Sequence, residues 1–343
     1  MKKFILTFTL LAFSINADQK EKSENCHNDS HSITHFAPAG VMGAHLHKKG
    51  EWMIGMRSMH MEMDGLRDGT KRISTSEGHA GGYMVVPKDM TMQMHMLDLM
   101  YGLNDDWTLT LMVPWVRYSM NLHRRMTMGM MTMEENFKVR NEGLGDIKLG
   151  SIFRAYEDNQ RQILLGLTLN LPTADLEAES NTPVSEDMRL GYPMQIGSGT
   201  WDFIPSIVYN RFFDNWSWGT KLSSTIHTGT NSEGYRRGDT LEWNLWGSKA
   251  LNHVFALNGR IQFKAWEDYH GKDDQLAMMS SMNPVADPHL RSGKNASVFG
   301  GFTWQSSKNS KIQFEAGIPF YQEIDGPNLE TDVVVNLNYL LTF

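Results

Sequence analysis

The feature that most constrains this sequence is an alternation of apolar and polar residues that recurs along most of its length. In the last stretch, Asp332 to Phe343, an apolar residue stands at every second position from Val333 onward, and most residues between them are polar. Successive side chains of a β-strand point to opposite faces, so such a strand has one apolar face and one mostly polar face. The sequence therefore predicts an all-β protein built from half-exposed strands.

Twelve segments show this alternation, and the connections between them alternate in length. The expected strands cover 51–63, 90–103, 107–120, 145–156, 161–172, 199–212, 216–229, 239–250, 253–266, 295–306, 311–322 and 331–343. Five connections are very short turns, whereas six are mostly long: 64–89, 121–144, 173–198, 230–238, 267–294 and 323–330. This is how transmembrane barrels place short turns in the periplasm and long loops outside. We expect a closed antiparallel transmembrane β-barrel of about 12 strands, of the outer-membrane type, over residues 51–343; either 121–144 or 36–50 could add a further strand.

Charged residues of both signs fall on the face of the strands that is not apolar. The apolar face carries tryptophans at the ends of its stripes, as Trp107 and Trp115 do, which is typical of aromatic girdles at the two membrane interfaces. A charge facing lipid costs roughly 2–4 kcal/mol at the midplane, so the charges belong inside the barrel. The mixed signs predict no obvious ion selectivity. The predicted lumen-lining residues are Arg57, Asp98, Asp146, Lys148, Arg154, Asp202, Lys221, Glu242, Arg260, Lys264 and Glu315.

The two ends of the chain indicate export. Lys2 and Lys3 precede a short apolar run that ends before small residues, which predicts a signal peptide over residues 1–17. Residues 18–50 are polar and contain histidines and the single cysteine, so we expect a periplasmic N-terminal segment without an internal disulfide. The C-terminal Phe343 resembles the terminal signal of bacterial outer-membrane barrels. The expected location is the outer membrane of a Gram-negative bacterium, with membrane lipid and, through Phe343, the barrel assembly machinery as partners.

Four short motifs resemble a known family. They are Gly143–Gly150 (GLGDIKLG), Leu171–Thr173 (LPT), Gly197–Asp202 (GSGTWD) and Gly234–Asp239 (GYRRGD). In order and in their placement at strand ends they are similar to the phenol-degradation meta-pathway outer-membrane transporter family, and the likeness covers most of the mature chain. The resemblance implies a bacterial outer-membrane barrel that transports small molecules. It does not imply that the protein degrades aromatic compounds.

Methionine is unusually abundant, with 25 residues, and many stand at every second position between Met42 and Met133. Met59 shares a strand face with Arg57, and Met96 with Asp98, so these side chains should face the lumen. Flexible methionines can line a narrow path for varied apolar solutes, which predicts a transporter or pore for small molecules. Thioether sulfur is also a soft ligand that selects Cu(I). The alternative is an outer-membrane protein that binds, exports or confers resistance to Cu(I) or Ag(I).

No closed metal-ligand set can be drawn from the sequence, so no cofactor is predicted. Cu(I) stays open as an alternative because of the methionines. The candidate metal ligands are Met59, Met61, Met63, Met92, Met94, Met96, Met128, Met130, Cys26, His27, His31 and His35. No phosphate-binding loop, dinucleotide fingerprint or serine near His253 is found, so catalytic residues are not predicted and the chain should not be an enzyme. A net charge of -7 without a basic stripe argues against nucleic acid as a partner. A purely structural or adhesive barrel is a third possibility.

Overall fold

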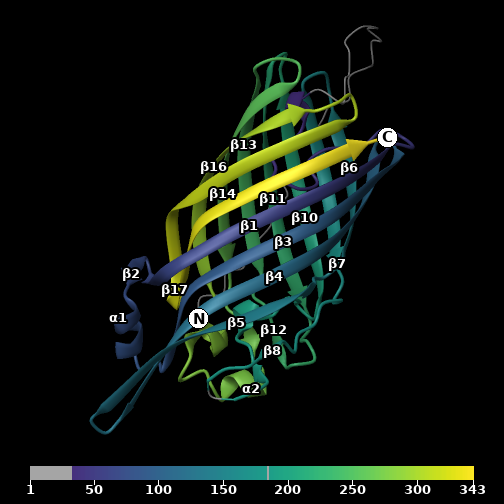
Figure 1. The fold of residues 1–343 in the computed structure, drawn as a ribbon. Coiled ribbons are helices and arrows are strands. Elements are labelled where there is room, and N and C mark those ends of the chain that lie inside the picture. Colours follow the sequence, from purple (N-terminus) through teal and green to yellow (C-terminus); the bar gives the residue numbers. More distant parts are fainter. Residues whose placement is uncertain (1–32, 184) are drawn as a thin grey trace, which may run out of the picture.

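The structure, a computed structural model, describes residues 33–343 except residue 184. The predicted signal peptide and the candidate ligands Cys26, His27 and His31 lie outside the described residues. Eleven strands close into one antiparallel barrel (Figure 1). In ring order they are β1 (Trp52–Gly69), β3 (Val85–Asn104), β4 (Trp107–Met128), β6 (Lys148–Glu157), β7 (Arg161–Asn170), β10 (Trp201–Phe212), β11 (Trp216–Thr228), β13 (Thr240–Ala250), β14 (Phe255–Trp266), β16 (Gly293–Gln305) and β17 (Ser310–Thr342).

The long strand β17 crosses the wall twice and closes the barrel. Its first part pairs with β16, from Lys311 opposite Gln305 to Ile324 opposite Gly293. Its second part pairs with β1 and ends with Thr342 opposite Met53. Ten other strands cross once, so the chain makes twelve passes. The predicted antiparallel barrel of about 12 strands is confirmed. The connection 323–330, expected to be a long loop, is instead part of β17.

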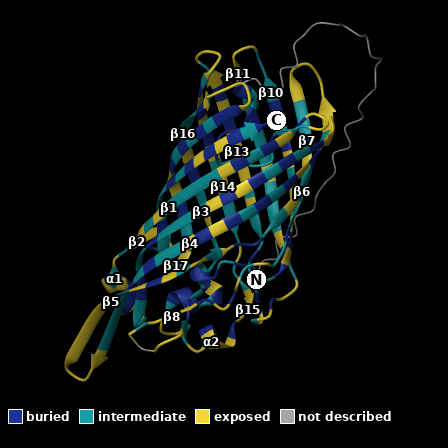
Figure 2. Ribbon diagram, turned by 45° about the vertical axis from the view of Figure 1, so that its right-hand side comes forward, coloured by how far each residue is buried: buried dark blue, intermediate teal, exposed yellow. Residues whose placement is uncertain are grey.

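The outer face of the wall is apolar and bounded by aromatic side chains. Exposed residues alternate with buried ones along the strands (Figure 2). Exposed rings lie toward both ends of the barrel: Trp52, Trp107, Trp216, Trp304 and Phe343 near the short turns, and Trp115, Trp201, Trp243, Phe263 and Phe320 near the long connections. Such an apolar band between two aromatic girdles fits a bilayer, and the end with the long connections is the outer one.

The wall is taller on one side than the sequence predicts, because residues 121–144 form a hairpin and not a loop. Strand β4 continues to Met128 and pairs with β5 (Met131–Leu144), from Trp115 opposite Leu144 to Met128 opposite Met131. This hairpin projects from the outer end of the barrel (Figure 1). Its charged residues, such as Arg125 and Glu134 at 2.7 Å, suggested a loop. Beyond the bilayer, however, both faces of a strand can be polar.

The remaining outer connections fold over the end of the barrel. They contain the hairpin strand β2 (Lys71–Ile73), the short helices α1 (Thr75–Ala80) and α2 (Asp274–Ala277), and the two-residue strands β8 (Glu179–Ser180), β9 (Met188–Arg189), β12 (Tyr235–Arg236) and β15 (His270–Gly271). Helix α1 begins with a capping box in which Ser74 and Glu77 bond each other's backbone amides. The hydrogen bonds from Ser74 and Lys71 lower the pKa of Glu77 to about 2. No helix among residues 33–343 is long and apolar enough to cross a membrane.

Candidate functional site

Residues 33–50, here called the lumen segment, run inside the barrel at its periplasmic end. Polar side chains of the wall donate hydrogen bonds to its backbone carbonyls, and these donors come from β1, β10, β11 and β17. The bonds join Lys221 to Met42 (2.7 Å), Gln313 to Ala37 (2.8 Å), Asn338 to Ala39 (2.8 Å), Arg57 to Ala39 (3.1 Å) and Asn210 to Ala44 (3.1 Å). Residues 33–50 of the predicted N-terminal segment therefore contact the inner wall of the barrel.

The lumen segment also has an apolar side that packs against the wall. Phe36, Val41 and Ala44 are buried in one cluster with inward side chains of seven surrounding wall positions. These are Met53, Met100, Ile152, Leu164, Val208, Trp246 and Leu340. Because apolar contacts and carbonyl hydrogen bonds both hold it, the segment fills the periplasmic end of the lumen.

Directly above the lumen segment, toward the outer end, lies a group of charged side chains that we call the charged belt. All its members lie on the inner face of the wall: Arg57, Asp98, Lys148, Lys221, Glu242 and Lys264. Arg57 donates to the Asp98 carboxylate across the β1–β3 pair. Lys221 is in electrostatic range of Arg57 and Lys148, and Lys148 of Asp98 and Lys264. The members of the belt therefore surround one level of the lumen.

The other residues predicted to line the lumen have separate places. Arg260 and Glu315 form a buried ion pair on β14 and β17. Arg154 lies at the periplasmic rim, where it pairs with Asp106 at 2.7 Å and also with Glu157. Arg154 thus braces a turn and does not reach the belt.

Asp146 and Asp202 lie at the outer ends of β6 and β10, where they hold the outer connections by hydrogen bonds. Asp146, in the break between β5 and β6, accepts hydrogen bonds from the amides of Thr173 (3.1 Å) and Ser198 (2.8 Å). Asp202 Oδ1 lies 2.9 Å from His227 Nδ1 and accepts a hydrogen bond from the Thr200 hydroxyl at 2.6 Å. Three of the sequence motifs, around Asp146, Thr173 and Ser198, therefore meet at one carboxylate. These motifs fix the loops to the barrel and are not themselves a solute site.

The methionines of β1 and β3 lie on the inner face, one step further out than the belt. The strand register places three pairs opposite each other: Met59 and Met94, Met61 and Met92, and Met63 and Met90. Met96 stands opposite Arg57. Directly opposite side chains on one face of an antiparallel pair have Cβ atoms about 4.5–5.5 Å apart. We call these seven residues the methionine ladder.

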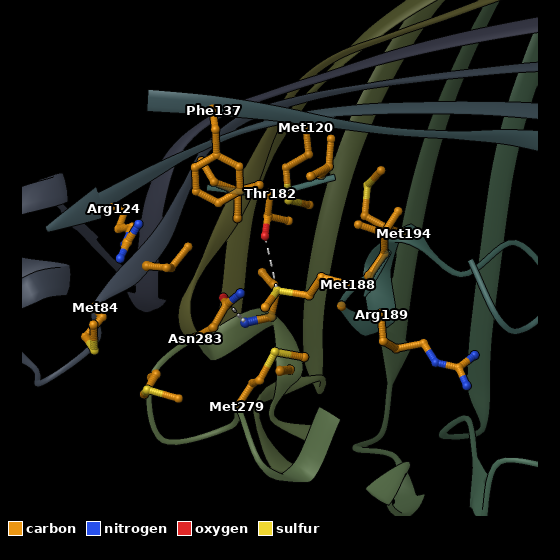
Figure 3. Close-up of a pocket in the computed structure, with 18 of the residues that line it drawn as sticks. Met84, Met120, Arg124, Phe137, Thr182, Met188, Arg189, Met194, Met279 and Asn283 are labelled. Carbon is orange, nitrogen blue, oxygen red and sulfur yellow. Dashed lines mark hydrogen bonds between the residues drawn. The ribbon is translucent and has the colours of Figure 1, made fainter. Parts of the chain in front are cut away.

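An apolar cavity of about 280 Å³ opens beside the outer end of this ladder (Figure 3). Its walls come from β4, β5 and the loops 171–200 and 267–292, and seven of the lining residues are methionines: Met84, Met120, Met126, Met188, Met194, Met279 and Met282. Phe137 and Leu190 also line it, with Arg124 and Asn283 among the few polar groups. We call it the outer pocket.

The outer pocket and the methionine ladder are in contact through packed side chains. One buried cluster contains Met90 and Met120, with Met63 packed against it, and includes Leu190 and Met194 from the loop 171–200. The sequence did not indicate Met120, Leu190 or Met194 as site residues, because their apolar character alone does not distinguish a pocket lining from a core. Only the folding of the loop over the barrel brings Leu190 and Met194 to Met120 of β4.

Among the described residues, the other candidate metal ligands Met128, Met130 and His35 are not brought to the ladder. Met128 and Met130 lie at the tip of the β4–β5 hairpin, where they are 67% and 99% exposed. His35 lies in the lumen segment, with its ring 4.2 Å from that of Phe212. In the part of the chain that the structure describes, no group of three or more His, Cys, Asp or Glu side chains is arranged to hold a metal ion.

Buried tyrosines fill the outer cap next to the pocket. The rings of Tyr192 and Tyr235 lie edge to face at 5.0 Å, and Tyr269 stacks on Tyr235 at 5.9 Å. Burial raises the pKa of both Tyr192 and Tyr235, so their phenols stay neutral. The neutral phenols thus lie beside buried charges of the cap, where Arg189 pairs with Glu233 at 3.0 Å and lies 3.6 Å from Asp273.

A closed barrel whose outer face is an apolar band between two aromatic girdles belongs to the class of outer-membrane β-barrel proteins. The family model described as "Putative MetA-pathway of phenol degradation" matches residues 78–329. The chain belongs to this family, which confirms the resemblance found in its motifs. No curated protein matches the sequence.

A solved outer-membrane channel shares this fold, and two further solved transporters show a weaker likeness that carries no argument. The outer membrane channel from Pseudomonas putida F1 is 12% identical with a TM-score of 0.58, and the match covers 88% of this chain and 99% of that one. The toluene transporter TbuX of Ralstonia pickettii is 11% identical with a TM-score of 0.44, over 91% of this chain and 95% of that one. The toluene transporter TodX of P. putida is 9% identical with a TM-score of 0.45, over 87% and 91%. Identities this low concern the fold alone.

Proposed function

We propose that this protein is a channel that admits small apolar solutes from the outside through the outer pocket and along a methionine-lined part of the lumen. The observation that carries the proposal is the outer pocket itself, a concave and mostly apolar site with a few polar groups, as small-molecule sites are. A cavity of 150 Å³ lined by apolar side chains can bind benzene. A volume of about 280 Å³ therefore holds a solute with a single aromatic ring.

The methionines support passage because of their flexibility. Met side chains adapt to solutes of different shape, and the buried cluster that joins Met120 to Met63 leads from the pocket toward the lumen. The lumen segment closes the periplasmic end, so release requires a rearrangement of that segment. Such a channel has no catalytic step, in line with the absence of a predicted catalytic constellation.

Filling the outer pocket tests the proposal. Met279 lines the pocket, whereas its neighbour Met278 is exposed and does not. Met279→Trp should weaken the binding of benzyl alcohol about tenfold or more, because the bulky indole displaces a ring whose burial contributes roughly 1.5–3 kcal/mol. Calorimetric titration of the refolded protein measures the dissociation constant. Met278→Trp is the matched control and should bind as the wild type does; equal affinities in all three proteins would refute the proposal.

A second candidate function, binding or resistance to Cu(I) or Ag(I), is favoured by one observation. Three methionine pairs face each other across β1 and β3, so thioether sulfurs lie close together on the inner wall. A deletion strain grown in graded copper tests this role, and an unchanged sensitivity would argue against it. For assembly, we propose that Phe343 is the segment that the barrel assembly machinery recognises, in line with its exposed ring at the end of the last pass.

A further inference from the structure

The charged belt contains lysines without a matching carboxylate. Among the described residues, Lys148 and Lys264 form no ion pair and donate no hydrogen bond. The Nζ atom of Lys264 lies 5.9 Å from the centroid of the Trp266 ring. Lys221 donates to a carbonyl of the lumen segment, which is not charged. Glu242 lies opposite Lys264 in the register but accepts its hydrogen bond from Asn244 at 2.7 Å. Lys148 and Lys264 therefore lack a direct carboxylate partner, although Glu242 lies in electrostatic range of Lys264.

The other carboxylates near these lysines already have partners. Asp98 accepts from Arg57. Asp146 accepts two hydrogen bonds from Ser198 and one each from the amides of Thr173 and Ala174. Asp202 accepts from Thr200 at 2.6 Å and lies 2.9 Å from His227. Asp146 and Asp202 lie in electrostatic range of Lys148, but among the described residues no carboxylate forms an ion pair with Lys148 or Lys264.

The opposite wall at the next level is apolar. In the ring order β1 and β11 are separated by five passes on either side, and β3 and β13 likewise, so these pairs of strands face each other. Met59 and Met61 on β1 and Met92 and Met94 on β3 therefore lie across the lumen from the strands that carry Lys221 and Glu242. These four methionines face inward and are only half-buried, so they border open space.

We infer that the chamber above the lumen segment binds a small organic anion, with its apolar part against the methionine ladder and its carboxylate at Lys148 and Lys264. A carboxylate gives each ammonium the charge-assisted hydrogen bond that the wall withholds. An ammonium group without a paired anion is costly in a lumen of low dielectric. An anion that pairs with it is therefore favoured over a neutral solute of the same shape. The inference deepens the proposed function, because the solute reaches this chamber through the outer pocket.

A comparison of benzoate with benzyl alcohol tests the inference, since the two share a ring and differ in charge. Calorimetric titration of the refolded wild type at low ionic strength should give tighter binding of benzoate. Lys148→Gln with Lys264→Gln should weaken benzoate binding about tenfold or more, the loss expected for one charge-assisted hydrogen bond, and leave benzyl alcohol within about twofold. Added salt should weaken only the binding of benzoate.

Two further variants keep the outcome interpretable. Lys148→Arg with Lys264→Arg retains the charges and should retain the preference for benzoate. Lys308→Gln, in an exposed periplasmic turn, should change nothing. A wild type that binds both compounds equally, or a double Gln variant that still prefers benzoate, would overturn the inference. Benzyl alcohol binding that is lost in Met279→Trp would then still support the outer pocket, so the two proposals fail separately.

Discussion

At the scale of single residues, the stability of the lumen depends on charges that occur in fixed pairs. Arg260 donates to Glu315 from inside the wall, lies 3.8 Å from the ring of Phe299, and also bonds Asn244 at 2.6 Å. Both charged side chains are almost fully buried. Such a pair contributes little relative to apolar residues of the same size, but removal of one partner leaves a buried charge without compensation.

Glu315→Gln should therefore lower the free energy of unfolding by about 3 kcal/mol, near the lower end of the range for broken buried pairs. Urea titration of the barrel in lipid vesicles, followed by tryptophan fluorescence, measures this change. Glu323→Gln is the matched control, because Glu323 pairs with Lys294 at 3.7 Å on the exposed rim and its replacement should lower the free energy of unfolding far less. Similar losses in both variants would show that the burial of Glu315 does not decide the cost.

Alternation in the sequence indicates which face a charged residue occupies, but not its partner. Period two was enough to place Arg57 and Asp98 on one side of their strands, and the structure has both on the inner face. The pairing of Arg260 with Glu315 depends on how the strands are staggered around the ring, and no local pattern encodes this stagger. The same limit applies to Arg154, whose position at the rim follows from a turn that places Asp106 beside it.

At the scale of whole elements, strand faces were predictable and the packing of loops and segments was not. The strands that carry Trp107 or Phe255 have strong periodicity, and their predicted limits agree with β4 and β14 to within a few residues at the end nearest the short turns. The segment 121–144 was placed among the long connections, with a further strand there left open, and the structure has it as the outer part of β4 and as β5. The lumen segment forms no regular strand or helix beyond the turn of 3-10 helix at Ile33–His35. Its place inside the barrel is therefore set by its side-chain contacts and not by a periodic pattern.

The methionine ladder gives the element-scale prediction. Met92, Met94 and Met96 lie on one face of β3, and their replacement by Leu keeps the apolar bulk but removes the sulfur. If the ladder serves apolar solutes, the triple variant should bind benzyl alcohol within about threefold of the wild type, because volume-conserving apolar exchanges are tolerated. If the ladder binds Cu(I), copper sensitivity of a complemented deletion strain should instead match that of the empty strain. A Leu variant that loses solute binding and keeps its copper response would contradict both roles.

At the scale of the whole molecule, the lumen segment makes the barrel a closed channel. A wall of twelve passes encloses a space that is narrower than the aqueous channel of roughly sixteen strands, so a single extended segment can fill it. The segment is held by side-chain donors to its carbonyls and by one apolar cluster, not by strand pairing along its length. Its contacts are individually modest and are separate from the backbone hydrogen bonds that close the wall.

Deletion of residues 33–47 should therefore raise the single-channel conductance in planar bilayers severalfold, because the periplasmic end of the lumen loses the chain that fills it. The wall should still form, since its backbone hydrogen bonds lie between strands of the ring, and a shift in electrophoretic mobility on heating checks that it has. Deletion of 128–131 at the tip of the β4–β5 hairpin is the control and should leave the conductance unchanged, because this tip lies outside the lumen. If the first deletion gives a folded barrel with the conductance of the wild type, the closure must lie in the outer cap of loops, with its buried Tyr192 and Tyr235, and not in the lumen segment.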